Sequence, residues 1–174
     1  MTDLTRRDAL AATAFAALVT ALPAWAQDRS APVDAAQWDL SEIYPDDAAW
    51  DAARKSVLAK IPGLASYRGK LGTGAEVLAA ALVAQSDLSR EAARVYTYAG
   101  LKIDADLRIF ANQEKLALVG DMFTAFGEAT SWMAPELLML GKAKIDGFIA
   151  ANRTLATRFD LYLADTLRQA PHTL

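Results

Sequence analysis

No proline interrupts residues 63–134, and apolar residues recur through this stretch at helical spacing. One polar link, Asp104-Ala105-Asp106, divides the stretch into two arms, predicted at 75–102 and 107–133. The apolar positions are Leu78, Leu82, Leu88, Ala92, Val95 and Ala99 in the first arm, and Leu107, Phe110, Ala111, Leu118, Met122, Ala125 and Ala129 in the second. Because two long helices joined by so short a link must lie antiparallel, the sequence predicts a helical hairpin.

Two further features refine this hairpin. Thr73 and Glu76 have the spacing of a capping box, in which each side chain accepts a hydrogen bond from a backbone N–H at the helix start. Removing the Thr73 side chain is therefore expected to cost about 1 kcal/mol. A second apolar side on the second arm predicts contacts beyond the hairpin partner, and it consists of Leu116, Val119, Phe123 and Phe126.

Shorter helices are predicted on either side of the hairpin. Pro45 excludes the helical conformation for the residue before it, and the acidic pair Asp46-Asp47 favours a helix start, so a first helix is predicted at 47–61. After Pro135 the pattern predicts short segments at 136–140, 146–151 and 155–167. The expected buried side of the last segment is Leu155, Phe159, Tyr162, Leu163 and Leu167. No segment alternates as a β-strand does, so the predicted fold class is all-α.

The first 26 residues have the pattern of an export signal. Arg6 and Arg7 precede a mildly apolar run, and a small-x-small site predicts cleavage after Ala26. The paired arginines favour twin-arginine export of a folded protein, and an ordinary secretory leader is the alternative. The apolar run is too short and alanine-rich for a good membrane span. We therefore expect an exported protein, periplasmic or secreted, with a flexible lead-in at 27–37 and a helical domain at 38–174.

Composition argues against several classes of function. A net charge of −3 and a pI near 5.1 give no basic surface for nucleic acid. The chain has no cysteine and a single histidine, His172, so it cannot build a transition-metal site, a cysteine nucleophile or a C-x-x-C-H haem attachment by itself. A Ser-His-Asp triad would require His172 at a terminus where nothing fixes its tautomer. No catalytic, cofactor-binding or metal-binding residue is predicted in this chain.

Several groups that invite a functional interpretation are predicted to be structural. The glycine-rich loop 69–74 lacks the spacing of a P-loop and follows a helix, so we expect an interhelical turn rather than a phosphate cradle. Tyr96 and Tyr98 lie on different helix faces, so at most one of them belongs to the hairpin seam. The acidic pairs Asp46-Asp47 and Asp104/Asp106 are expected to cap helix starts, and the aromatic residues Trp38, Trp50 and Trp132 are expected in the core.

Three segments, together with an acidic helix start that contains Trp50, resemble the amino-terminal part of oligoendopeptidase F. These segments are residues 38–45 (WDLSEIYP), 89–99 (SREAARVYTYA) and 167–174 (LRQAPHTL). The family belongs to the thimet-oligopeptidase-like zinc metallopeptidases. No single segment performs chemistry, but their order and spacing are together fairly specific.

The resemblance implies a large helical enzyme with a deep channel, zinc bound by an H-E-x-x-H helix and a further glutamate, and cleavage of short peptides by a metal-activated water. This chain contains no H-E-x-x-H sequence. We therefore expect the catalytic domain and its zinc to lie beyond Leu174, the hairpin 75–133 to form part of the channel wall, and the chain alone to be inactive. Residues 27–174 in isolation are expected to bind apolar dyes or to oligomerise.

Two other functions are compatible with the pattern. A free-standing periplasmic helical module that binds peptides or proteins without catalysis is the main alternative. A helical-bundle cofactor carrier is disfavoured, because axial ligands and a haem attachment sequence are missing. A coding frame that continues to an H-E-x-x-H motif would favour the enzyme over the module.

Overall fold

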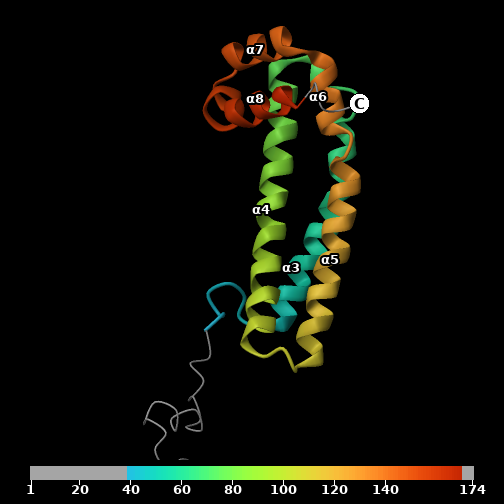
Figure 1. The fold of residues 1–174 in the computed structure, drawn as a ribbon, viewed down its shortest axis with the longest axis vertical. Coiled ribbons are helices and arrows are strands. Elements are labelled where there is room, and N and C mark those ends of the chain that lie inside the picture. The colour runs from blue at the N-terminus through green and yellow to red at the C-terminus, as the bar shows by residue number, and fades with distance from the viewer. Residues whose placement is uncertain (1–38, 170–174) are drawn as a thin grey trace, which may run out of the picture. The chain divides into compact units, whose positions relative to one another are not determined.

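The computed structural model describes residues 39–169, and every regular element in that range is helical (Figure 1). The α-helices are α3 (Asp47–Lys60), α4 (Ala75–Ala105), α5 (Phe110–Thr130), α6 (Met133–Leu140), α7 (Lys142–Ala151) and α8 (Asp160–Arg168). Two 3₁₀ segments, η2 (Ile61–Tyr67) and η3 (Leu71–Thr73), and one π-helical turn, η4 (Leu155–Phe159), connect them. The predicted all-α class is confirmed for this range.

The long helices α4 and α5 form the predicted antiparallel hairpin, and α3 packs against both of them (Figure 1). Helix α3 begins where predicted, because the Asp46 carboxylate accepts a hydrogen bond of 2.7 Å from the Ala49 N–H. It ends where Pro62 enters the first turn of η2. None of the described helices is long and apolar enough to cross a membrane.

One core cluster joins α3, η2, the second half of α4 and the middle of α5; we call it the three-helix cluster. Trp50 lies at its centre, where its indole N–H donates a 2.9 Å hydrogen bond to the Val95 carbonyl. The indole also stacks on the ring of Tyr98 with the ring centroids 6.4 Å apart. The buried members are Trp50, Val57, Ile61, Leu64, Leu88, Ala92, Val95, Tyr98, Ala99, Val119 and Met122. The core prediction for Trp50 is therefore confirmed.

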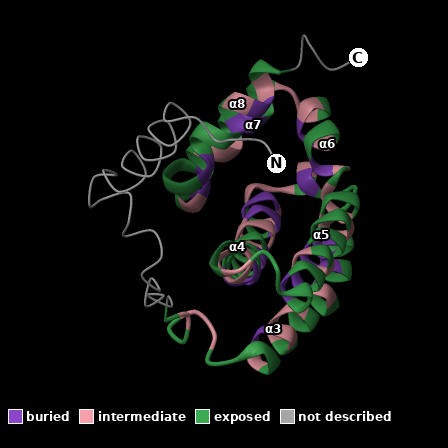
Figure 2. Cartoon of the chain, turned by 60° about the horizontal axis from the view of Figure 1, so that its bottom comes forward, coloured by how far each residue is buried: buried purple, intermediate pink, exposed green. Residues whose placement is uncertain are grey.

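A second core, the terminal cluster, joins the first half of α4 to η3, α6, α7, η4 and α8 (Figure 2). Its buried members are Leu71, Leu78, Ala79, Ala81, Leu82, Met133, Leu137, Ile145, Leu155, Phe159 and Leu163. The first half of α4 thus packs in the terminal cluster, and its second half packs in the three-helix cluster. All six apolar positions predicted for the first arm are buried.

The capping box was predicted wrongly. Gly74 precedes α4 as its N-cap, and no side chain caps that helix. The Thr73 hydroxyl instead donates to the Lys70 carbonyl at 2.7 Å within η3. The Glu76 carboxylate is bound by the side-chain amide of Asn152, at 2.8 Å. A tertiary contact has therefore displaced the local cap that the spacing favours.

The apolar face on which Leu107, Phe110 and Met122 were predicted to lie in the second arm is partly wrong. Met122 is fully buried, but α5 begins only at Phe110, and both Leu107 and Phe110 are exposed. Near this end of α5 the buried residues are the polar Asn112 and Lys115. The second arm also ends at Thr130 rather than 133, since residues 133–140 form the separate helix α6.

The last helical segment also differs from its prediction. Residues 155–159 form a π-helical turn before α8 instead of the first turns of a single α-helix. Leu155, Phe159 and Leu163 are buried as predicted, and Leu167 packs partly buried against the terminal cluster. Tyr162 is exposed, so the prediction that it is buried was wrong.

Candidate functional site

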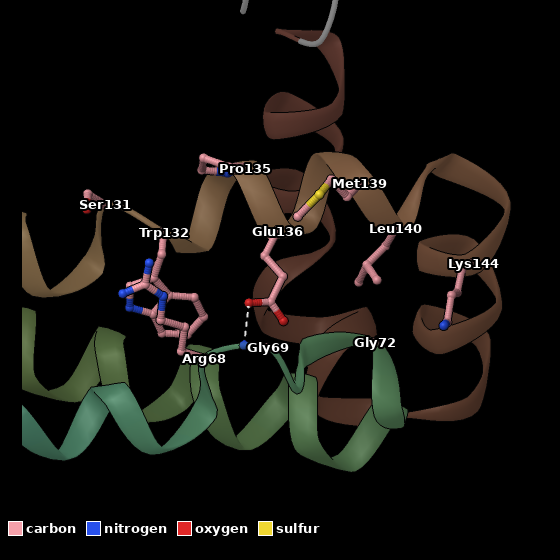
Figure 3. Close-up of a pocket in the computed structure, with 10 residues that line it drawn as sticks. All are labelled: Arg68, Gly69, Gly72, Ser131, Trp132, Pro135, Glu136, Met139, Leu140 and Lys144. Carbon is pink, nitrogen blue, oxygen red and sulfur yellow. Dashed lines mark hydrogen bonds between the residues drawn. The ribbon is translucent and has the colours of Figure 1, made fainter.

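A groove lies between the loop that follows η2 and the outer side of α6, at the end of the fold that carries the terminal cluster (Figure 3). Its volume is about 740 Å³, within the range of pockets that bind small ligands. Trp132, Pro135, Met139 and Leu140 of the α6 region form its apolar wall. Arg68, Gly69 and Gly72 contribute the opposite edge, and Lys144 of α7 lies at one end.

Glu136 fixes the floor of this groove. Its two carboxylate oxygens accept hydrogen bonds of 2.8 Å from the backbone N–H groups of Gly69 and Leu71. Figure 3 shows the bond from Gly69. Gly69 adopts a φ of +75°, a left-handed conformation that favours glycine and turns its N–H toward the carboxylate. The glycine-rich loop therefore does hold an anion, but the anion is the protein's own Glu136.

Two cationic side chains line the groove without an anionic partner. Among the described residues, no ion pair or side-chain hydrogen bond engages Arg68 or the Lys144 ammonium, and both residues are exposed. The Lys144 Nζ lies 5.8 Å from the centroid of the Phe148 ring, a contact that leaves its hydrogen-bond donors available. The groove thus combines an apolar wall with two available positive charges.

A separate polar cluster joins α3, α4 and α5 beside the three-helix cluster. The Asp47 carboxylate accepts a 2.9 Å hydrogen bond from the Tyr98 hydroxyl and forms a 2.8 Å ion pair with the Lys115 ammonium. The Lys115 side chain is only 11% exposed, whereas that of Asp47 is 53% exposed. Lys102 approaches the face of the Tyr98 ring, with its Nζ 5.4 Å from the centroid.

The cluster shifts the pKa values of two of its members. Partial burial acts to raise the pKa of Asp47, but the hydrogen bonds from Lys115 and Tyr98, with the charges of Lys115 and Lys102, outweigh it and hold the pKa below its usual value. Burial, and then the hydrogen bond to Asp47, raise the pKa of Tyr98 to about 12. Tyr98 therefore stays protonated at neutral pH and donates a hydrogen bond rather than acting as a base.

The comparisons with known proteins point to one family. No family model matches the chain. The oligopeptidase PepF of Bacillus subtilis is 31% identical over 147 residues, which are 84% of this chain and 22% of PepF. A crystal structure of a putative peptidase from Chlamydophila abortus is 28% identical with a TM-score of 0.67, over 79% of this chain and 23% of that protein. The chain is a partial homologue of the oligoendopeptidase F family.

A crystal structure of oligoendopeptidase-F from Enterococcus faecium has the same fold, with a TM-score of 0.67 and 24% identity over 74% of this chain and 25% of that one. The sequence similarity to PepF confirms the predicted resemblance to the oligoendopeptidase F family. The chain spans less than a quarter of the length of PepF. Most of each relative's length therefore has no counterpart in the 174 residues of this chain.

The acidic pairs are structural in this oligoendopeptidase F homologue, although not always as predicted. Asp46 caps α3, as expected, while Asp47 of the same pair belongs to the polar cluster. Asp106 ends α4, and its carboxylate binds the backbone N–H and the guanidinium of Arg108. Asp104 lies in the last turn of α4, so the prediction that Asp104 and Asp106 cap the next helix start was wrong.

The aromatic residues divide between the core and the surface. Tyr98 is buried and Tyr96 is exposed, which confirms that the two lie on different faces of α4. Trp132 packs partly buried against the terminal cluster, and it also lines the groove. Five residues singled out in the sequence lie outside the described range: Arg6, Arg7, Ala26, Trp38 and His172.

Between residues 39 and 169, no three histidine, cysteine or carboxylate side chains gather as a metal ion would require. The described side chains of this oligoendopeptidase F homologue therefore do not fit a zinc ion. Sequence reasoning missed Glu136, Arg68 and Lys144, which come together only through tertiary packing. The sole local signal was the glycine-rich loop, whose backbone N–H groups are typical of anion-binding turns.

Proposed function

We propose that this chain is the amino-terminal helical region of a zinc metalloendopeptidase that hydrolyses short oligopeptides. The observation that carries the proposal is the 31% identity to oligopeptidase PepF over 147 residues, supported by the fold shared with two solved peptidase chains. In this proposal zinc and its H-E-x-x-H helix belong to a catalytic region outside the 174 residues, and the chain alone does not hydrolyse peptides.

The hairpin is proposed to form part of one wall of the channel that admits the peptide. Large apolar side chains remain exposed along it and near its tip, and we call them the hairpin patch: Tyr96, Leu107, Ile109, Phe110 and Phe123. Tyr96 and Phe123 pack edge to face with their centroids 6.1 Å apart, which joins α4 and α5 on the outer surface. Exposed apolar groups of this kind favour contact with further protein, so the catalytic region is the proposed partner of the patch.

Export is proposed from the leader, whose residues lie outside the described range. In this proposal Arg6 and Arg7 direct twin-arginine export, cleavage follows Ala26, and the mature enzyme acts on peptides outside the cytoplasm. Export after folding would allow zinc to be loaded in the cytoplasm. Signal cleavage is tested by determining the amino-terminal residue of the exported protein, which should be Gln27.

The proposed activity is tested with the polypeptide encoded by the natural gene. The coding frame should continue beyond Leu174 to an H-E-x-x-H sequence, and the product should hydrolyse a quenched-fluorescent peptide in a chelator-sensitive manner. A stop codon directly after Leu174, with no chelator-sensitive hydrolysis, would favour the alternative, a non-catalytic periplasmic helical module that binds peptides or proteins.

A further inference from the structure

A smaller pocket lies between helix α4 and the π-helical turn η4 with the start of α8, and we call it the η4 pocket. Its volume is about 330 Å³, at the lower end of the range for pockets that bind small ligands. Helix α4 contributes three polar lining residues, Gln85, Ser86 and Ser89. Arg158 of η4 and Tyr162 of α8 line the other side. Turns of the π-helical kind occur frequently at functional sites.

The polar side chains of the η4 pocket are available to a ligand. Within residues 39–169, no side-chain hydrogen bond engages Gln85, Ser86 or Ser89. The Tyr162 hydroxyl likewise makes no hydrogen bond in that range, and the residue is 39% exposed. A hydroxyl and a side-chain amide can each both donate and accept a hydrogen bond. The α4 side of the pocket therefore offers three groups that can pair with either an N–H or a carbonyl.

The three polar side chains of α4 lie in one row. Residues three and four apart share a helix face, so Gln85 and Ser86 are neighbours on this face and Ser89 lies one turn further along. One helical turn advances about 5.4 Å, and two residues of an extended chain advance about 6.6 Å. The row therefore has nearly the spacing at which an extended peptide repeats its N–H and carbonyl groups along one edge.

Arg158 is held beside α4 by contacts that leave its hydrogen-bond donors available. Its guanidinium lies 3.7 Å from the Asp87 carboxylate, and its Cζ lies 5.3 Å from the centroid of the Phe159 ring. Arg90 pairs with the same Asp87 oxygen at 2.5 Å. Arg158 makes no hydrogen bond within the described part of the chain, although a guanidinium carries five N–H donors. A carbonyl oxygen in the pocket can therefore accept from Arg158.

The apolar residues that line the η4 pocket offer little surface to a ligand side chain. Leu82 is 1% exposed and Phe159 is 8% exposed, because both belong to the terminal cluster. None of the described residues that line this pocket is acidic, so the lining does not favour a cationic ligand. Its available groups instead match a neutral ligand that carries both donors and acceptors, as the main chain of a peptide does.

We propose that the η4 pocket binds the main chain of a short extended peptide, with little dependence on the peptide's side chains. Gln85, Ser86 and Ser89 pair with the N–H and carbonyl groups along one edge of the peptide. Arg158 donates to a carbonyl oxygen from the other side of the pocket. The choice of a peptide as the ligand rests on the proposed peptidase function, whereas the preference for a neutral ligand with donors and acceptors rests on the pocket alone.

A titration followed by ¹⁵N NMR tests the proposal on the 174-residue chain. The probe is acetyl-Ala-Ala-Ala-Ala-amide, and the comparison peptide has N-methyl groups on its two central residues, which removes two N–H donors. We expect the side-chain signals of Gln85 and Arg158 to shift with the probe and to saturate with a Kd on the order of 1 mM. N-methylation should weaken binding by about threefold or more, whereas acetyl-Ser-Ala-Ser-Ala-amide should bind within about twofold of the probe.

Variants assign the binding to the η4 pocket. Q85A and R158Q should each weaken binding of the probe about two- to tenfold through the loss of a hydrogen bond, and the double variant about tenfold or more. The matched control is R90Q, because Arg90 pairs with the same Asp87 carboxylate as Arg158 but does not line the pocket. R90Q should leave the Kd unchanged. Circular dichroism confirms that each variant is folded.

Equal affinity for the probe and its N-methylated form would overturn the proposal, as would unchanged binding in the folded Q85A/R158Q variant or no binding by the unmodified chain. Each of these results would leave the proposed peptidase function standing, because chelator-sensitive hydrolysis by the product of the natural gene is measured separately. Conversely, main-chain-dependent binding without hydrolysis by that product would support the η4 pocket and refute the peptidase, in favour of the peptide-binding module.

Discussion

Replacing Lys115 with methionine removes the ammonium that joins α5 to α3 while keeping a long apolar side chain. The Lys115 Nζ lies 2.8 Å from the Asp47 carboxylate, and the lysine side chain is 11% exposed while that of Asp47 is 53% exposed. Exposed ion pairs contribute about 0.2–1 kcal/mol, and removing one partner of a buried pair costs about 3–5 kcal/mol. With one partner buried and the other half in water, we expect a coupling energy of about 1–2 kcal/mol.

A double-mutant cycle measures this coupling. The free energy of unfolding is determined by urea denaturation for K115M, D47N, the double variant and the unmodified chain. The matched control is the pair Lys55–Asp51 on the exposed side of α3, 2.7 Å apart, for which K55M and D51N should couple by less than about 0.5 kcal/mol. Equal coupling in the two cycles would refute the argument that burial of Lys115 strengthens its ion pair.

The Lys115–Asp47 coupling should also depend on pH. The folded-state pKa of Asp47 lies below the ordinary aspartate value of 3.8, so its contribution to stability is complete above that value. The contribution is lost as the pH falls through the lowered folded pKa, where the carboxylate becomes protonated. A coupling energy that stayed constant down to strongly acidic pH would contradict this assignment.

Three further outcomes are expected. Tyr98 has a pKa of about 12 in the folded chain, against 10.0 for an unperturbed tyrosine, so its contribution to stability is complete below pH 10 and is lost as the pH rises toward 12. Y98F should therefore reduce the fall in the free energy of unfolding that urea denaturation measures at alkaline pH. E136A removes the acceptor for the Gly69 and Leu71 N–H groups and should lower the free energy of unfolding by about 1–3 kcal/mol, whereas a change below about 0.3 kcal/mol would show that the loop holds its shape unaided. F110S changes a residue that is 78% exposed, so it should reduce the binding of an apolar dye to residues 27–174 and change the free energy of unfolding by less than about 0.5 kcal/mol. Unchanged dye binding would count against the hairpin patch.

The parts of the fold that follow from local patterns could be predicted from the sequence. The spacing of apolar residues in α4 identified its buried side, because Val95 and Ala99 repeat on one helical face and both are fully buried. Pro45 and Pro62 bracketed α3 to within a residue, since proline restricts the backbone at each end. These features depend on neighbours in the chain.

The features that were missed depend on distant partners. Lys115 was assigned no buried role, yet its stem packs inside while its ammonium binds Asp47 on another helix. Asn112 is buried because its side-chain amide donates to the Lys102 carbonyl at 2.9 Å, across the turn of the hairpin. The capping box failed for the same reason, since Asn152 binds the Glu76 carboxylate. Helical periodicity contains no information about such contacts.

The candidate site was likewise beyond local patterns. The glycine-rich loop was correctly predicted to be an interhelical turn, but its anionic partner, Glu136, is far along the chain and lies on α6. Arg68 and Lys144 are ordinary surface cations in the sequence. They become a candidate site only because η3 packs against α6, where a Cβ added at Gly72 would lie 2.6 Å from Leu140 Cδ2 and 3.3 Å from Lys144 Nζ.

Chelator-sensitive peptide hydrolysis by the complete product of the natural gene is the most direct test of the proposed peptidase function. The assay uses a quenched-fluorescent oligopeptide, with the activity measured before chelation, after chelation and after zinc is restored. The proposal predicts hydrolysis that is lost on chelation and returns with zinc, and no hydrolysis by the 174-residue chain alone. A complete product that is folded and exported but cleaves no peptide under any of these conditions would contradict it.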